Sequence, residues 1–281
     1  MNRFARGLAI AFLLAGSLAA AQGQGGFRGG FRGGWGGETG MPPRFPSATD
    51  FDGSFHFCRL MYTQVRRQER GLGWGTDYPY ADINFSIRLS ELTKTKVGWA
   101  GTEPNHLVVR PTDEALFQCP FVLASDPGSA GFSAADAAGL RDYLLKGGFL
   151  WVDDYWGPWA WQAFADEIGK ALPPSEYPIH ELTPDHPIYH VLFSVNEIPQ
   201  VPSIQFWRQS GGETSEMGEY SAHAHMAAIT DKHGRVMVLM THNTDISDSW
   251  EREGEDPRFF FSFSPNGYPV AMNSVLYAMT H

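Results

Sequence analysis

One stretch in the middle of the chain reads as a strand, a helix and a second strand joined by short turns. Phe121–Ala124 and Phe149–Val152 are short apolar runs, which is typical of strands buried on both faces of a parallel sheet. Between them Ser133 is a good helix N-cap, and Asp136 follows three residues later, as in a capping box. This unit predicts a right-handed parallel crossover, and in open parallel sheets ligands bind at the carboxyl ends of the strands.

The rest of the chain alternates between strand and helix patterns and then forms a hairpin. Met226–Thr230 and Arg235–Thr241 flank a turn with glycine at its last position, which predicts antiparallel pairing. We therefore expect an α/β protein, a three-layer sandwich whose sheet is mostly parallel with a late β-hairpin. The other expected elements are strands at Phe55–Tyr62, Leu107–Arg110 and Ser203–Trp207, helices at Asp82–Thr93 (where alternating apolar residues also suit a strand), Thr112–Phe117, Pro158–Leu172 and Tyr268–Met279, and an acidic loop at Asn243–Asp256.

The first residues indicate export. Arg3 and Arg6 precede the apolar run Leu8–Leu18, which is too short to span a bilayer comfortably, and Ala19–Ala21 offers small residues for cleavage. This predicts a signal peptide at residues 1–21 and a periplasmic or secreted protein, with a retained N-terminal anchor as the lesser alternative. No later segment is apolar enough to cross a membrane.

Composition argues against nucleic acid as a partner. The chain has 21 Lys and Arg against 31 Asp and Glu, a net charge of -10, and loss of residues 1–21 removes two further positive charges. Residues 22–46 are rich in glycine, arginine and aromatic residues, like some RNA-binding tails, but behind an export signal they read as a flexible linker. Residues 47–281 are then enough for one α/β domain.

The two cysteines, Cys58 and Cys119, allow two interpretations. An exported chain permits a disulfide, and both residues lie on or beside strands expected to be neighbours. Two buried free thiols are the alternative, which the sequence slightly favours. Neither cysteine stands in a nucleophile-elbow motif.

Several segments together resemble a known family. They are Arg59-Leu-Met-Tyr, the stretch from Trp74 and Asp77 to Leu92, Leu140 to Asp154, Asp185-His-Pro-Ile-Tyr and Gly234-Arg-Val-Met-Val-Leu. They look like the bacterial domain-of-unknown-function family 4159, over about residues 55–281. That family resembles the class I glutamine amidotransferase-like superfold, a flavodoxin-like layered sheet. In glutamine-hydrolysing relatives the strand after the Gly-Gly turn leads to a nucleophilic cysteine, whereas here it leads to Asp153. The resemblance therefore implies the fold, argues against glutamine hydrolysis and assigns no catalytic residue.

Acidic residues end the two central strands. Ser125 and Asp126 follow the first of these strands, and Asp153 and Asp154 follow the second. Adjacent residues of a strand point to opposite faces, so paired carboxylates in one crevice would need Asp126 with one of the other two. The alternative is that these acids cap helices and accept hydrogen bonds from loop amides.

Histidines and arginines supply two further candidate sites. His223 and His225 share a face if that stretch is extended, which is a usable metal-ligand spacing; His242, Asp245, Asp126 and Asp153 could complete a site for zinc or another divalent ion. Surface or hydrogen-bonded histidines are the alternative. Arg59 and Arg66 could clamp an anion, or instead form a salt bridge to Asp153 or Asp154.

Aromatic residues follow the second strand closely. Tyr155 and Trp156 stand beside the carboxylates, a combination that suits sugar rings. For Trp159 and Trp161 the sequence favours the other interpretation, in which they lie on the next helix and fill the core.

The leading hypothesis is thus a non-catalytic ligand-binding or accessory protein for a carbohydrate or a cell-envelope component, with a pocket at the carboxyl edge of the sheet. The alternatives are a metal-dependent hydrolase that uses Asp and His residues, and a scaffold subunit of an envelope protein complex. The sequence indicates no cofactor other than a divalent metal ion.

Overall fold

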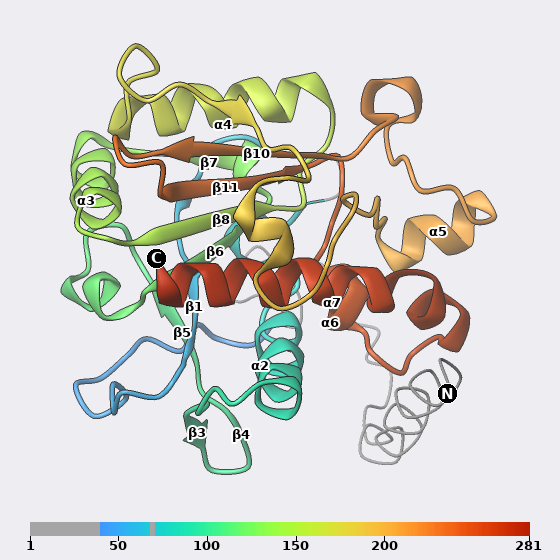
Figure 1. The fold of residues 1–281 in the computed structure, drawn as a ribbon, viewed down its shortest axis with the longest axis horizontal. Helices are drawn as coiled ribbons and strands as arrows, with labels where there is room; N and C mark the ends of the chain where they lie inside the picture. Colours follow the sequence, from blue (N-terminus) through green and yellow to red (C-terminus); the bar gives the residue numbers. More distant parts are fainter. Residues whose placement is uncertain (1–39, 68–70) are drawn as a thin grey trace, which may run out of the picture.

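Seven strands form one central sheet in the order β5-β1-β6-β8-β11-β10-β9 (Figure 1). The structure is a computed structural model and describes residues 40–67 and 71–281; the predicted signal peptide and residues 22–39 of the predicted linker lie outside this range. The first five strands of the order are parallel to one another, β10 is antiparallel to β11, and β9 is antiparallel to β10. Their bounds are β1 (Phe57–Leu60), β5 (His106–Val109), β6 (Phe121–Ser125), β8 (Phe149–Asp153), β9 (His180–Glu181), β10 (His225–Thr230) and β11 (Val236–His242).

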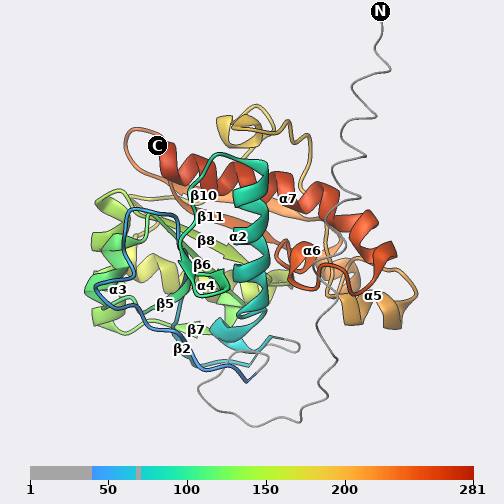
Figure 2. The same ribbon diagram turned by 90° about the horizontal axis from the view of Figure 1, so that it is seen from below.

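Helices cover both faces of this sheet. Helices α2 (Tyr80–Leu92) and α7 (Pro257–Thr280) pack on one face, where Phe85 and Val275 join the core with Phe121 and Trp151. Helices α3 (Ala134–Leu145) and α4 (Gly157–Ala171) pack on the other. Figure 2 shows α7 and α3 on opposite sides of the strands. The described residues thus form a mixed α/β structure with six α-helices around a mostly parallel sheet.

The smaller elements lie in the connections between these layers. They are helices α5 (Ile204–Ser210) and α6 (Asp248–Glu251), the 3-10 helices η1 (Gly73–Gly75), η2 (Glu114–Gln118), η3 (Pro127–Ser129), η4 (Pro187–His190) and η5 (Gly218–Ser221), and the two-residue strand pairs β2 (Thr63–Gln64) with β7 (Ala130–Gly131) and β3 (Trp99–Ala100) with β4 (Glu103–Pro104).

The predicted central unit is confirmed in detail. Ser133 caps α3, and its side chain and that of Asp136 exchange hydrogen bonds with each other's backbone N–H. Strands β6 and β8 pair in parallel from Phe121 opposite Phe149 to Ser125 opposite Asp153. The polar residues that follow both strands therefore lie side by side at the carboxyl edge of the sheet.

Three local predictions were wrong, each because tertiary packing decided the outcome. Ser203–Trp207 is not a strand: Ser203 caps α5, accepting a hydrogen bond from the Phe206 N–H. The helix expected at Tyr268–Met279 is longer: α7 begins at Pro257 and contains Pro265 and Pro269. The helix tolerates these prolines because burial of its long apolar face against the sheet compensates for the lost backbone hydrogen bonds. The segment expected as an acidic loop at Asn243–Asp256 contains helix α6 (Asp248–Glu251), and every residue from 241 to 251 is buried.

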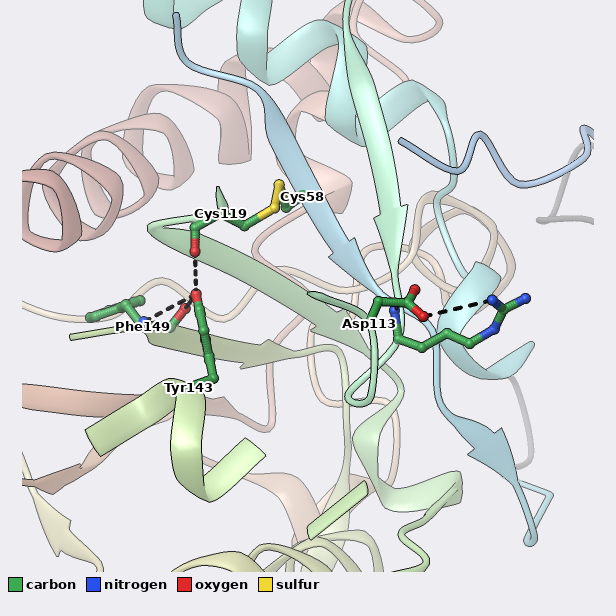
Figure 3. Close-up of a disulfide and its surroundings, with 6 residues drawn as sticks. Cys58, Asp113, Cys119, Tyr143 and Phe149 are labelled. Carbon is green, nitrogen blue, oxygen red and sulfur yellow. Dashed lines mark hydrogen bonds and ion pairs between the residues drawn. A yellow bond between two sulfur atoms is a disulfide. The ribbon is translucent and has the colours of Figure 1, made fainter. Parts of the chain in front are cut away.

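A disulfide joins β1 to the chain segment just before β6 (Figure 3). Cys58 and Cys119 are both buried, with a Cα–Cα distance of 6.1 Å. The Tyr143 hydroxyl donates to the Cys119 carbonyl at 2.7 Å and accepts from the Phe149 N–H at 3.2 Å, which ties α3 to the same region. The structure therefore favours the disulfide over the free thiols, and no cysteine of the chain is left free.

No helix in the described part of the chain combines the length and the apolar character needed to cross a bilayer.

Candidate functional site

Polar residues at the carboxyl edge adopt an unusual backbone conformation. Within the described residues, four non-glycine residues have positive φ: Asp77 (64°), Asp126 (48°), Asp154 (57°) and Asn243 (59°). Three of them directly follow β6, β8 and β11, and Asp77 precedes α2. A left-handed conformation costs a residue with a side chain roughly 1–2 kcal/mol, and such costs concentrate at functional sites. The backbone therefore marks this edge of the sheet as the candidate site.

Three carboxylates from three different segments meet at this edge. Asp77, Asp154 and Asp245 each offer an oxygen, and these oxygens all lie within 4.8 Å of one another. Asp77 and Asp245 are buried, whereas Asp154 is partly exposed. Burial raises the pKa of Asp154 well above its usual range, and the nearby Asp77 and Asp126 carboxylates raise it further. We call these three residues the carboxylate cluster.

The cluster continues into α6. Asp248 and Glu251 form a second group with Asp77, again with oxygens within 4.8 Å of one another. Asp248 accepts a hydrogen bond from the Ile204 N–H at 2.9 Å, and Glu251 lies 2.8 Å from the Arg252 guanidinium. Burial raises the pKa of Asp245 well above its usual range, and repulsion from Asp154, Asp77 and Asp248 raises it further. Protons or a cation must therefore neutralise part of this charge at neutral pH.

The Ser247 hydroxyl is surrounded by three carboxylates. Its oxygen lies 2.9 Å from Asp153, 3.2 Å from Asp77 and 3.2 Å from Asp245. One hydroxyl has a single proton to donate, so it cannot satisfy three ionised carboxylates at once. The geometry fits a cluster that binds a cation or shares protons.

Asp153 has a structural role. It is fully buried, one of its oxygens accepts from the Thr241 hydroxyl at 2.6 Å, and the other accepts from the Ser247 N–H at 2.9 Å. These bonds fasten the buried acidic segment to the end of β8. The interpretation of this acid as an acceptor for loop amides matches its contacts.

Asp126 lies under the loop that contains η1. It is buried, and one of its oxygens accepts from the Gly73 N–H at 2.9 Å. A Cβ atom at Gly71 would approach the Asp126 carboxylate to 2.2 Å, so the backbone can pass this close only because Gly71 has no side chain. Burial raises the pKa of Asp126 to about 7. This carboxyl is therefore poised to gain or lose a proton near neutral pH.

Arg59 holds the loop in place. Its guanidinium is fully buried and pairs with Asp82 of α2 at 2.5 Å, instead of with Asp153 or Asp154. It also donates to the Thr76 carbonyl and to the Ser125 hydroxyl, both at 2.8 Å. Arg59 and Ser125 thus position the segment that carries Asp77.

The other predicted ligand-binding residues lie around the cluster. The half-exposed Arg66 donates to the Ala130 carbonyl at 2.7 Å and pairs with Glu167 at 3.2 Å, so it anchors β7 and α4. The Trp156 indole donates to Asp154 at 3.2 Å and therefore adjoins the carboxylate cluster directly. Tyr155 is buried, and its hydroxyl has no hydrogen-bond partner among the described residues.

The predicted histidines are only partly brought together. His225 and His242 are opposite each other in the β10–β11 pair, with ring centroids 6.1 Å apart. His242 is buried, and burial lowers its pKa to about 4. The exposed His223 contributes its carbonyl, which accepts from the Asn243 side chain at 2.9 Å. Asp245 lies with the other carboxylates instead of with a histidine.

Sequence reasoning missed Asp77, Asp248 and Glu251. Asp77 stands in a glycine-rich loop far along the chain from the other acids, and Asp248 and Glu251 belong to the segment expected to be an acidic loop. The available signal was composition: Thr241 to Glu251 combines acids with apolar residues such as Ile246 and Trp250, which is unusual for a solvated loop.

Two hollows in the described structure lie away from the carboxylate cluster. One of about 590 Å³ is between α3 and α4, beside Arg141 and Lys170. The other, of about 360 Å³, is at the amino edge of the sheet, beside His56 and Cys58.

Comparison with known proteins agrees with the resemblance seen in the sequence. The family model described as "Domain of unknown function (DUF4159)" matches residues 56–279, nearly all of the described structure. Comparison with the curated proteins gives no match. The chain therefore belongs to the DUF4159 family.

Proposed function

We propose that this is an exported, non-catalytic ligand-binding protein that holds a divalent cation at the carboxylate cluster and binds a carbohydrate or cell-envelope component beside it. The observation that carries the proposal is the meeting of Asp77, Asp154 and Asp245 within 4.8 Å. Ligand oxygens on opposite sides of Ca²⁺ lie about 4.6–5.2 Å apart, so three oxygens at this spacing can share one ion.

The ligand type selects the ion. Carboxylate and hydroxyl oxygens favour the hard cations Ca²⁺, Mg²⁺ and Mn²⁺ over zinc. Burial and then like-charge repulsion raise the pKa values of Asp154 and Asp245, and a bound cation would relieve the repulsion. Asp248 and Glu251 are close enough to Asp77 to support the same ion or a neighbouring one.

The aromatic residues beside the cluster support a sugar as the ligand. Trp156 is fixed by its hydrogen bond to Asp154, and Trp159, in the first turn of α4, is 83% exposed. Exposed aromatic rings stack on sugar C–H faces, while carboxylates and a cation bind hydroxyl groups. Trp159 lies on the surface, which supports the binding interpretation over the core-filling one for this residue.

The fold also supports a binding protein over a glutamine amidotransferase. Counted along the chain, the five parallel strands have the order 2-1-3-4-5, which is the flavodoxin-like order and supports that architecture for the superfold. Both cysteines form the disulfide, and Asp153 and Asp154 occupy the place of a nucleophile. The disulfide fits the proposed periplasmic or secreted location.

The test is the melting temperature of EDTA-treated, tag-free mature protein with added Ca²⁺, Mg²⁺ or Mn²⁺. Saturating cation should raise the melting temperature, because an ion that binds only the folded state stabilises it by mass action. Asp154→Asn should remove most of this shift, while Asp142→Asn, which changes an exposed acid on α3, should leave it intact. No shift with any of the three ions, together with no calcium, magnesium or manganese by elemental analysis of the untreated protein, would refute the cation site.

A metal-dependent hydrolase is the second candidate, and Asp126 is the observation that favours it. Its pKa of about 7 suits proton transfer at neutral pH, and it is close enough to Asp154 to affect the pKa of that residue. Ester and amide substrates incubated with the cation-loaded protein decide between the two candidates. Turnover that Asp126→Asn abolishes, with cation binding retained, would replace the binding proposal with the hydrolase.

A further inference from the structure

A second group of metal-ligand side chains lies on the last three strands of the sheet. His225 of β10 is directly opposite His242 of β11, so both side chains point to the same face. Glu181 of β9 is opposite Ala227, which is two residues after His225 and therefore on that face as well. The register of three neighbouring strands thus places two imidazoles and one carboxylate together.

The distance between His225 and Glu181 fits a shared ion. The Nδ1 atom of His225 lies 3.4 Å from an oxygen of Glu181. Two ligand atoms on a tetrahedral zinc ion lie about 3.3 Å apart, given metal–ligand bonds near 2.05 Å. The rings of His225 and His242 are nearly parallel at 23°, with centroids 6.1 Å apart. The ligand atoms of all three residues do not lie within 4.8 Å of one another, so one ion can bridge the two rings only after His225 rotates towards His242. His225 has room for this rotation because its side chain is 46% exposed.

His242 is already oriented as metal-binding histidines are. Its Nε2 lies 3.0 Å from the Gly157 carbonyl, which can accept a hydrogen bond only from a protonated nitrogen. In the neutral ring, Nδ1 then keeps its lone pair for a metal. The ring is also packed between Tyr155 and Trp161, with centroids at 4.8 Å and 5.0 Å. A hydrogen bond from the second ring nitrogen to a carbonyl is the usual arrangement behind a metal-bound histidine.

We infer that His225, His242 and Glu181 form a binding site for a transition-metal ion such as Zn²⁺, separate from the carboxylate cluster. Two imidazoles and one carboxylate suit zinc and its first-row neighbours, whereas the all-oxygen cluster suits hard cations. Three protein ligands leave a coordination position for water or for a ligand group. The site depends on none of Asp77, Asp154 and Asp245, so it stands or falls independently of the proposed function.

The test is calorimetric titration of tag-free, EDTA-treated protein with Zn²⁺, and the absorption spectrum of the Co²⁺-substituted protein. We expect one equivalent to bind. His225→Ala and Glu181→Gln should each weaken binding by more than about tenfold, because each removes a ligand atom from the ion. Both side chains are about half exposed, so these variants should keep the circular dichroism spectrum of the parent.

Two control variants establish that Zn²⁺ binds at these three residues. His233→Ala changes an exposed histidine in the turn of the same hairpin and should leave Zn²⁺ binding unchanged. Asp154→Asn should also leave it unchanged while removing the response to Ca²⁺. The inference is overturned if the parent protein binds no Zn²⁺ saturably, if His225→Ala binds it as tightly as the parent does, or if Asp154→Asn is the variant that loses it.

Discussion

Replacing both cysteines of the Cys58–Cys119 disulfide with alanine should lower the free energy of unfolding by about 4 kcal/mol. The bond joins residues 61 positions apart. For a closed loop of that length, the chain-entropy relation gives about 14 cal/mol/K of lost entropy in the unfolded state, or about 4 kcal/mol at room temperature. Because both cysteines are buried, loss of their packing would add to this figure.

The assay is equilibrium unfolding in guanidinium chloride, followed by tryptophan fluorescence. The slope of free energy against denaturant should also rise in the variant, because an unfolded chain without the cross-link exposes more surface. Parent protein reduced under denaturing conditions and refolded with its thiols blocked from reoxidation separates the cross-link from side-chain packing. It should lose about 4 kcal/mol, and the alanine variant should lose somewhat more because it also lacks the packing of the two side chains.

Two results would refute this reasoning. One is a loss below about 1 kcal/mol with an unchanged slope, which would mean that the cross-link hardly restricts the unfolded chain. The other is alkylation of two thiols per chain when the oxidised, denatured protein is treated without a reductant, since the structure leaves no free cysteine.

Three further predictions concern charge and packing. Burial raises the pKa of Asp126 from 3.8 to about 7, so the folded state keeps this proton where the unfolded state has lost it, and this contribution to stability falls as pH rises through that window. In EDTA, Asp126→Asn should therefore lose about 3 kcal/mol less stability than the parent between pH 4 and pH 7, and equal losses would contradict the shift. Arg59→Ala leaves the buried Asp82 without its ion-pair partner and should cost about 3–5 kcal/mol in urea unfolding. Arg66→Ala should cost less than about 1 kcal/mol, because Arg66 is half-exposed and its partner Glu167 keeps an ion pair with Lys170. Gly267→Ala would place a Cβ 1.9 Å from the Ser249 hydroxyl and should lower the free energy of unfolding by about 1–3 kcal/mol. Its control, Gly169→Ala in α4, brings the new Cβ no closer than 3.7 Å to another atom and should be neutral or stabilising. Similar melting temperatures for the two variants would contradict the packing of α6 on α7.

The central crossover could be predicted because its signals are local. The apolar runs around Phe121 and Phe149, and the cap at Ser133, each act within a few residues of chain, and the structure keeps all of them. The hairpin turn at Asp231 is equally local. Elements of this kind are specified by short-range chemistry that tertiary packing did not overrule.

The carboxylate cluster could be predicted only in part. Asp154 was expected at this edge because it ends a recognisable strand. Asp77 was not, because nothing in the sequence shows that its loop folds back across the sheet; the tie is a buried contact between Arg59 and the Thr76 carbonyl. Glu181 was missed for the same reason, since β9 has only two residues and no strand pattern. Long-range pairings depend on the whole packed structure.

The acids at the carboxyl edge fall into two groups, those with a matching partner and those that repel their neighbours. Arg59 with Asp82, and Asp153 with Thr241 and Ser247, are matched by an opposite charge or by hydrogen-bond donors, and they fasten loops to strands. Burial raises the pKa values of Asp154 and Asp245, and repulsion from neighbouring acids, Asp77 among them, raises both further, so this arrangement opposes folding of the ion-free protein. A fold that needed only fastening would be more stable with amides at these positions, because like charges in a buried site repel. The arrangement is the one expected if these acids bind a cation or share a proton, as proposed above.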